Sequence, residues 1–287
     1  AFSQAQAPLS SFASPVCGQG TSAGTFTCRT PDYTQAQLSQ MKQAVEQNFA
    51  RMLGLPGSLT EIFQFLSAAA VLALLVLSPI TGTEYTQGTV RLLFTRGPTR
   101  LQCMLAKVLA SLIACAIILL LLSATYVLLG MLVYPLTGQP YSYTFGFFSS
   151  ASSGSIGNTV LLGLIILAYW FAYAMLAFFF GTLGRATAAA IGGALGWYIL
   201  EGIMGTVFGL LQFFIPTGTL HDLFKAIPDY LLNNNFSALI NNRLHAIDPT
   251  TALSSISDLH ALLVIAVYLL LLIGGACLLA RYRNITH

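Results

Sequence analysis

Long runs of apolar residues dominate this sequence, and they constrain its fold more than any other feature. The runs cover about 60–80, 104–133, 156–180, 188–214 and 259–280. Each is long enough to cross a bilayer as a helix, because the ~30 Å hydrocarbon core needs about 20 residues. Only 7% of the 287 residues are charged, whereas soluble domains carry about 25%. The sequence therefore predicts an all-α polytopic membrane protein with five transmembrane helices.

Two polar segments complete the predicted organisation. Residues 1–59 precede a transmembrane domain at 60–287, and residues 215–258 interrupt that domain. Residues 1–30 are rich in Ser, Gly, Pro and Thr and are typical of a loop. After Thr30-Pro31, apolar side chains recur at helical spacing and predict one amphipathic surface helix. These positions are Leu38, Met41, Val45, Phe49 and Met52.

The loops between the spans differ in charge, which predicts their orientation. Basic residues near the ends of transmembrane helices mark the cytoplasmic side. One side carries a single acid, Glu84, and these basic residues: Arg91, Arg96, Arg100, Lys107, Arg185, Arg281 and Arg283. The other side carries Arg29, Lys42, Arg51, Lys225 and Arg243, together with Asp32, Glu46, Glu61, Asp222, Asp229, Asp248 and Asp258. We therefore expect the C-terminus to be cytoplasmic, and residues 1–59 and 215–258 to be external.

An external N-terminal segment needs a way across the membrane. We expect a preceding span that is absent from this sequence, and hence a parent chain with six spans. External placement also suits a disulfide between Cys17 and Cys28, because disulfides persist in oxidising compartments. Two free thiols are the alternative.

Signatures of catalysis, metal binding and nucleic-acid binding are missing. A P-loop needs a Gly-rich turn followed by Lys and Ser or Thr, and none of the three lysines has that context. There is no GxSxG, no HExxH and no Cys/His cluster with metal-ligand spacing. The net charge of +3 is too small to indicate a nucleic-acid partner. We expect no catalytic residue, no metal site and no cofactor in this chain.

The polar stretch 84–107 lies between two apolar runs and carries the strongest local signal. Pro79 and Gly82 break the preceding helix, and Gly97-Pro98 ends a short helical pattern over 84–96. Thr99 can then cap the next helix. The pattern predicts a short cytoplasmic helix along the membrane surface. A basic loop that fixes topology and meets anionic lipid is the alternative.

The order of residues in this stretch resembles the permease subunits of ABC-2 type transporters. That family has an acidic residue and a Gly-Thr pair after its second span. A Leu pair, a Pro-x-Arg and a Lys then lead into its third. The matching residues are Glu84, Gly88-Thr89, Leu92-Leu93, Pro98, Arg100 and Lys107. The connector 181–185 and the segments 227–231 and 236–239 are also similar to the family, which usually has six spans.

The resemblance implies a function. Helix 84–96 would sit in a groove of a separate ATPase subunit, which would hold the ATP and Mg. Its coupling residues would be Glu84, Tyr85, Gly88, Thr89, Arg91 and Arg96. Two permease subunits, identical or paralogous, would enclose a pathway in a lipid bilayer, the bacterial cytoplasmic (inner) membrane. The chain would then be the membrane-spanning subunit of an ATP-driven exporter.

Glu201 lies in the middle of the apolar run 188–214. An ionised carboxylate at this depth costs about 2–3 kcal/mol even on insertion scales. It is either a pathway residue that touches substrate or cation, or a buried carboxyl hydrogen-bonded to a neighbouring helix.

Small residues at four-residue spacing in the same run, Gly192 and Gly196, allow close helix packing. That packing is either at the dimer seam that the resemblance implies or within one subunit. Aromatic residues of the run 156–180 are expected to pack or to face lipid, with an aromatic-lined substrate path as the alternative.

Two other functions remain open at this stage. One is a non-transporting membrane anchor or scaffold that uses segments 1–59 and 215–258. The other is an ion-coupled secondary transporter that uses Glu201.

Overall fold

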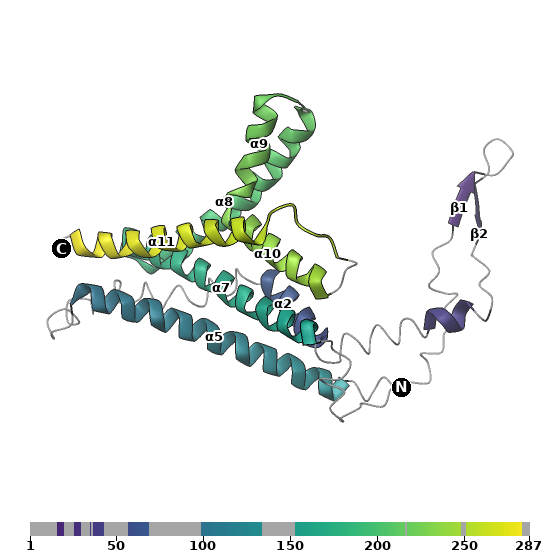
Figure 1. The fold of residues 1–287 in the computed structure, drawn as a ribbon, viewed down its shortest axis with the longest axis horizontal. Helices are drawn as coiled ribbons and strands as arrows, with labels where there is room; N and C mark the ends of the chain where they lie inside the picture. The colour runs from purple at the N-terminus through teal and green to yellow at the C-terminus, as the bar shows by residue number, and fades with distance from the viewer. Residues whose placement is uncertain are drawn as a thin grey trace.

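The computed structural model describes residues 16–19, 26–29, 35, 37–42, 57–68, 99–133, 153–215, 217–247 and 251–282. The described helices are α2 (Gly57–Ala68), α5 (Arg100–Val133), α7 (Ser153–Gly184), α8 (Thr187–Phe214), α9 (Thr219–Asp229), α10 (Leu232–Ile247) and α11 (Asp258–Tyr282) (Figure 1). Residues 37–42 are helical too, within the range of the predicted amphipathic helix.

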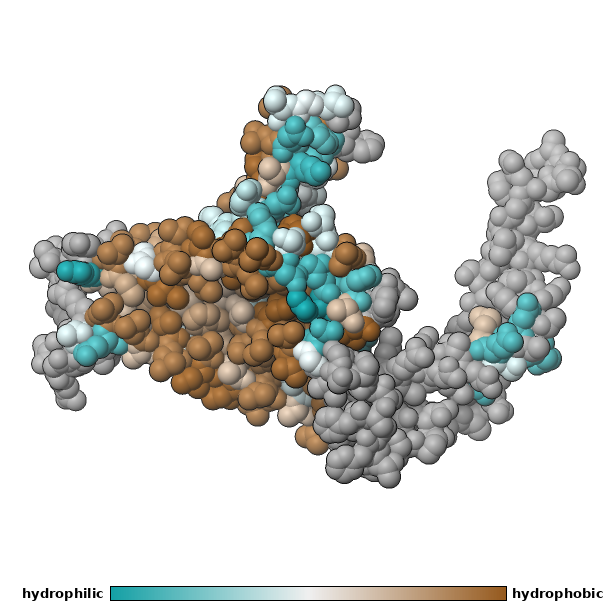
Figure 2. All heavy atoms as spheres, viewed as in Figure 1, coloured by the Kyte–Doolittle hydropathy of each residue, from teal (hydrophilic) through white to brown (hydrophobic). Residues whose placement is uncertain are grey.

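Four helices are long and apolar enough to cross a membrane. Their apolar segments are Leu101–Leu129, Gly157–Gly184, Thr187–Gln212 and Asp258–Arg281. They match four of the five predicted spans and make the chain a helical integral membrane protein. The fifth predicted span, 60–80, begins in α2, and the rest of it lies outside the described residues. Figure 2 shows a band of hydrophobic side chains between two more hydrophilic ends.

Helix α7 is the centre of the bundle. Side chains from Ala172 to Phe178 are all buried, so this part of the helix is covered on every side. Tyr169, Trp170 and Tyr173 are buried as well, and the Trp170 indole donates a hydrogen bond to the Leu66 carbonyl in α2 at 3.1 Å. These aromatic side chains therefore pack in the core of the chain, as the first of the two sequence interpretations expected.

A tight turn joins α7 to α8. Arg185 has a φ of 52°, in the left-handed region, which reverses the chain within two residues. The two helices then pack closely, because a Cβ on Gly193 of α8 would overlap the side chain of Phe180 of α7. Helix α11 also packs closely on α7, because a Cβ on Gly275 of α11 would lie 3.0 Å from the Phe179 ring of α7.

Polar residues cap the first turns of two spans. Thr99 Oγ1 accepts from the Gln102 amide at 3.3 Å, and Gln102 Oε1 accepts from the Thr99 amide at 2.9 Å. This reciprocal pair is a capping box, and it confirms Thr99 as the predicted cap of α5. At the start of α11, Ser257 Oγ accepts from the His260 amide at 3.4 Å.

The helix directions gather the basic residues at one end of the bundle. The start of α5, the α7–α8 turn and the end of α11 all lie at that end (Figure 1). It carries Arg100, Lys107, Arg185 and Arg281. The opposite end carries the acids of α9 and the start of α11.

The prediction of an all-α chain with a loop over 1–30 was wrong at one place. β1 (Val16–Gln19) and β2 (Phe26–Arg29) form an antiparallel hairpin in which Cys17 is paired with Cys28. Strands of four residues are too short to show an alternation of apolar and polar side chains in the sequence. Their pairing is a contact between two separate segments, so no local pattern predicts it.

Candidate functional site

Helices α9 and α10 form a V-shaped pair, in which α9 packs against α8, and α10 packs against α7 and α11. We call the residues that join them, 228–235, the elbow. Helix α9 packs along the second half of α8, where the Phe208 and Phe224 rings lie 5.8 Å apart and Gln212 Nε2 donates to the Phe224 carbonyl at 2.9 Å. These two segments project away from the rest of the bundle (Figure 1).

Helix α10 belongs to the other side of the V. It packs against α7 and α11, and the Phe236 ring lies 4.8 Å from the Tyr169 ring of α7. Its buried side chains are Leu232, Asn235, Phe236, Ala238, Leu239, Ile240 and Leu244. Six of these seven side chains are apolar, so the helix turns a mainly apolar face toward the core, although its sequence contains five asparagines.

Glu201 lies where the two sides of the V meet, and it is only 3% exposed. Its Oε2 accepts from the Tyr173 hydroxyl of α7 at 2.9 Å, and its Oε1 accepts from the Leu232 amide at 2.8 Å. Leu232 is the first residue of α10, whose N-terminal amides have no partner inside the helix. A carboxylate there also interacts favourably with the helix dipole. Glu201 thus caps α10 from a different helix.

Side chains from the spans also bind the elbow. The Tyr169 hydroxyl of α7 donates to Asn233 Oδ1 at 2.7 Å. From α11, the Tyr268 hydroxyl donates to the Tyr230 carbonyl at 3.2 Å, and His260 Nε2 lies 3.1 Å from the Asp229 carbonyl. Together with Glu201, these contacts tie the elbow to α7, α8 and α11.

The elbow also satisfies its own carbonyl groups. Asn235, fully buried, donates through Nδ2 to the carbonyls of Asp229 and Leu231, each at 2.8 Å. Asn234 Nδ2 donates to the Pro228 carbonyl at 3.0 Å. Amide side chains thereby replace the helical hydrogen bonds that the chain loses between α9 and α10.

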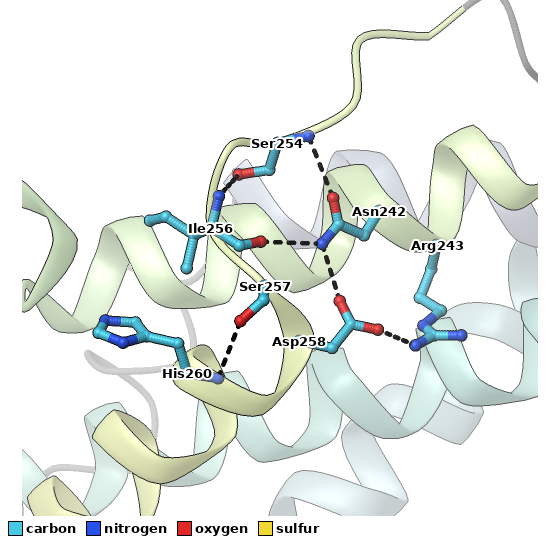
Figure 3. A network of polar contacts seen from close by, with 7 residues as sticks. All are labelled: Asn242, Arg243, Ser254, Ile256, Ser257, Asp258 and His260. Atoms are coloured by element: carbon cyan, nitrogen blue, oxygen red, sulfur yellow. Dashed lines mark hydrogen bonds and ion pairs between the residues drawn. The ribbon is translucent and has the colours of Figure 1, made fainter.

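A second polar cluster fixes the other end of α10 to α11 (Figure 3). Arg243 forms an ion pair with Asp258, and Asn242 Nδ2 donates to Asp258 Oδ1 at 2.7 Å and to the Ile256 carbonyl at 3.2 Å. Asn242 Oδ1 accepts from the Ser254 amide at 3.1 Å. We call Asn242, Arg243 and Asp258 the clamp. Because the elbow and the clamp hold both ends of α10, it is fixed against α7 and α11.

Among the described residues, no group of three or more His, Cys, Asp or Glu is placed to hold a metal ion. Most polar groups of the elbow bind one another, the backbone or side chains of the spans, whereas the buried Oδ1 of Asn235 has no partner among the described residues. The arrangement holds a break between two helices in place, inside an apolar surrounding.

The structure places the predicted site residues unevenly. All six predicted coupling residues, in 84–96, lie outside the described residues. Glu201 is hydrogen-bonded to neighbouring helices, as its second interpretation expected. Gly192 and Gly196 are exposed, and a Cβ on either would have no atom of the described residues within 4 Å. Cys17 and Cys28 are paired across the hairpin.

Sequence reasoning missed the elbow and its partners Tyr169 and Tyr173. It treated 215–258 as a polar external segment, with 227–231 and 236–239 noted for their resemblance to the permease family. The available signal was a run of three asparagines, 233–235, shortly after Pro228. Asparagine side chains can hydrogen-bond the backbone groups that are left unpaired where two helices are interrupted.

A family model described as "Protein of unknown function (DUF2705)" matches residues 33–286. The chain belongs to the DUF2705 family. The match spans α2 to α11, so the spans, the elbow and the clamp of this DUF2705 chain all lie inside it. No curated protein and no solved structure matches this chain significantly.

Proposed function

We propose that this DUF2705 chain is the membrane-spanning permease subunit of an ATP-driven transporter of the ABC-2 type, working as an exporter. The observation that carries the proposal is the order of Glu84, Gly88-Thr89, Pro98, Arg100 and Lys107 between two apolar runs. In this proposal, helix 84–96 docks on a separate ATPase subunit and transmits its closure to the spans.

Three features of the described residues support this proposal. Four apolar helices are long enough to cross a membrane. The capping box at Thr99 starts α5 directly after Pro98, as the Pro-x-Arg resemblance requires. Basic residues gather at the end where α5 begins, which supports a cytoplasmic position for the segment that precedes α5.

The surroundings of Glu201 favour an ATP-driven transporter over an ion-coupled one. Both of its carboxylate oxygens accept hydrogen bonds from protein donors, at 2.9 and 2.8 Å, and the side chain is 3% exposed. An ion-binding carboxylate needs free lone pairs and access from water. Here each oxygen already binds a donor of α7 or α10, and the side chain is buried away from water.

The proposal is tested by purifying the full chain from its own membranes in mild detergent and identifying its partners by mass spectrometry. We expect a P-loop ATPase to copurify, together with ATP hydrolysis. Gly88→Trp fills the position where two backbones would approach, and Arg91→Glu reverses a charge in the docking helix. Each should lower the recovered ATPase at least tenfold.

Lys225→Glu is the matched control, because Lys225 is an exposed basic residue of α9, away from the basic end. It should leave ATPase recovery unchanged. Transport driven by an ion gradient without ATP would contradict the proposal. So would a folded chain that purifies with no ATPase, which is the result expected of a membrane scaffold.

A further inference from the structure

The second half of α8 and most of α9 leave the bundle together, and we call these residues, 202–227, the arm. The arm projects sideways, across the direction in which α5, α7 and α11 run (Figure 1). Its base lies where α11 begins, because Nε2 of His260, in the first turn of α11, is 3.1 Å from the carbonyl of Asp229 at the end of α9. If α11 spans the membrane, the arm therefore extends along the membrane surface at the end opposite the basic residues.

Helix α9 carries its apolar and its charged residues on different sides. At about 100° per residue, Leu220 and Leu223 lie on one side of the helix, and Asp222 and Lys225 lie on the other. All four side chains are exposed, and no residue of α9 is buried. Packing among the described residues therefore leaves the two leucines largely uncovered.

The α8 part of the arm adds a second exposed apolar side. Four apolar residues recur there at spacings of four, three and four, which places them on one side of the helix: Ile203, Val207, Leu210 and Phe214. They are between 44% and 73% exposed. The other side of α8 carries Phe208 and Gln212, which contact Phe224 of α9. Contacts between its two helices thus hold the arm together, while apolar side chains of both remain exposed.

The polar surface of the arm continues that of the bundle. Figure 2 shows hydrophilic side chains running from α9 onto the end of the bundle opposite the basic residues, with hydrophobic side chains beside them toward the basic end. Bundle and arm therefore share one boundary between apolar and polar surface. An amphipathic helix in the plane of a membrane has this arrangement, with its apolar side about 5–10 Å into the boundary between headgroups and acyl chains.

The charges of the arm indicate which lipid surface it fits. It carries one acid, Asp222, and one base, Lys225, so their formal charges cancel. Anionic lipid strengthens the binding of an amphipathic helix by attracting an excess of basic residues, and the arm has no such excess. Its attachment therefore depends on burial of apolar side chains, for which a zwitterionic surface is sufficient.

We propose that the arm is an interfacial anchor, which lies on the external surface of the lipid bilayer. Leu220, Leu223 and the apolar side of α8 contact lipid, and Asp222 and Lys225 face water. Because the arm continues α8 and leads into the elbow, its contact with lipid holds both at a fixed height in the membrane. The inference needs only a chain that spans a membrane, so it stands or falls independently of any ATPase partner.

The position of the arm is tested with spin labels on full chains that carry no native cysteine, reconstituted in phosphatidylcholine vesicles. Leu220→Cys and Leu223→Cys place labels on the apolar side of α9, and Asp222→Cys and Lys225→Cys place them on the charged side. We expect labels on the apolar side to collide with oxygen and to be shielded several-fold from an aqueous nickel chelate relative to the charged side. A label at Leu263→Cys, an exposed position on α11, should be shielded further, because it lies deeper in the lipid.

The other outcomes overturn the proposal. High nickel access on both sides of α9 would place the arm in water. Low access of both oxygen and nickel on the apolar side would show that protein covers it, such as a second copy of this chain. Equal shielding from nickel on both sides would place α9 inside the hydrocarbon.

A second variant tests whether apolar contact holds the arm in place. In chains labelled at Leu220→Cys, Leu223→Lys adds a charge to the apolar side, and we expect nickel access at the label to rise several-fold. Lys225→Ala, on the charged side, is the matched control and should leave nickel access unchanged. Equal access in the two variants would contradict the anchor. A Leu220 label that is shielded only when anionic lipid is added would contradict attachment by apolar burial.

Discussion

Glu201 illustrates how a single carboxyl group is accommodated among apolar helices. Burial of a charge is costly unless hydrogen bonds compensate, and this side chain accepts from a phenol and from a helix N-terminus. The same bonds tie three helices together. At the scale of the residue, Glu201 is therefore the charged side chain of an apolar span on which the arrangement of the surrounding helices depends.

Adjacent glycines in α8 have opposite surroundings and permit a matched test. Gly193→Leu would force the side chain into Phe180, and overpacking of this kind costs about 1–3 kcal/mol. We expect a lower unfolding temperature in detergent. A Cβ on Gly192 would have no atom of the described residues within 4 Å, so we expect the unfolding temperature of Gly192→Leu to stay within the error of the parent.

The same pair reports on the proposed seam between two copies. If Gly192 and Gly196 face a second permease subunit, Gly192→Leu should weaken self-association, which crosslinking in membranes measures. Unchanged self-association would remove Gly192 from the seam.

At the scale of the element, α10 depends on contacts at both ends. Its N-terminus is capped by Glu201, and its second half is attached to α11 by the clamp. Its buried face is apolar apart from Asn235, while the clamp, at the opposite end from the elbow, is only partly buried. The separation of buried apolar side chains from the partly exposed polar ones explains how a helix with low overall hydropathy can pack against two spans.

The clamp predicts a difference between two first-turn acids. Asp258→Ala removes the acceptor of both Arg243 and Asn242, and partly exposed ionic contacts of this kind are worth up to about 1 kcal/mol each. We expect faster amide hydrogen exchange in 240–257. Asp222→Ala, in the first turn of α9, removes a side chain with no partner among the described residues. It should leave exchange in 240–257 unchanged, and an equal effect of both variants would contradict a specific clamp.

At the scale of the whole molecule, the directions of the helices place the basic residues at one end of the bundle. The basic residues of α5, of the α7–α8 turn and of α11 come together at one end, although they are far apart in the sequence. Burial is uneven, since α7 is largely enclosed while few side chains of α5, α8 and α11 are fully buried. That exposure suits lipid or a further subunit, in agreement with the proposed assembly.

The β-hairpin gives a test of which side the N-terminal segment faces. Directly opposite residues of an antiparallel pair have Cα atoms about 4.5–5.5 Å apart, and disulfides span about 4.4–6.8 Å. Because Cys17 and Cys28 are such a pair, we expect them to be bridged if residues 1–59 are external.

Alkylation of the denatured chain, followed by mass spectrometry, checks this bridge. Cys17 and Cys28 should be modified only after reduction, whereas Cys103, Cys115 and Cys277 are free in the structure and should react without reduction. Modification of Cys17 and Cys28 without reduction would argue against both the bridge and the external assignment.

Local sequence patterns predict the class of the protein and most of its helices. Apolar runs are local and long, so they fix spans such as 104–133 to within a few residues of α5 and allow recognition of the Thr99 cap. Glu201 was noticed because one charge stands out in such a run.

Only the tertiary structure decided what Glu201 does and what 215–258 becomes. The bond between Glu201 and the Leu232 amide joins residues 31 positions apart, and no local pattern encodes such a contact. Helix α10 appears polar along the chain because its asparagines are prominent. Four of the five serve the break and the clamp, while the apolar side chains of the helix are buried against α7 and α11. Packing between distant segments, rather than local propensity, fixes this region.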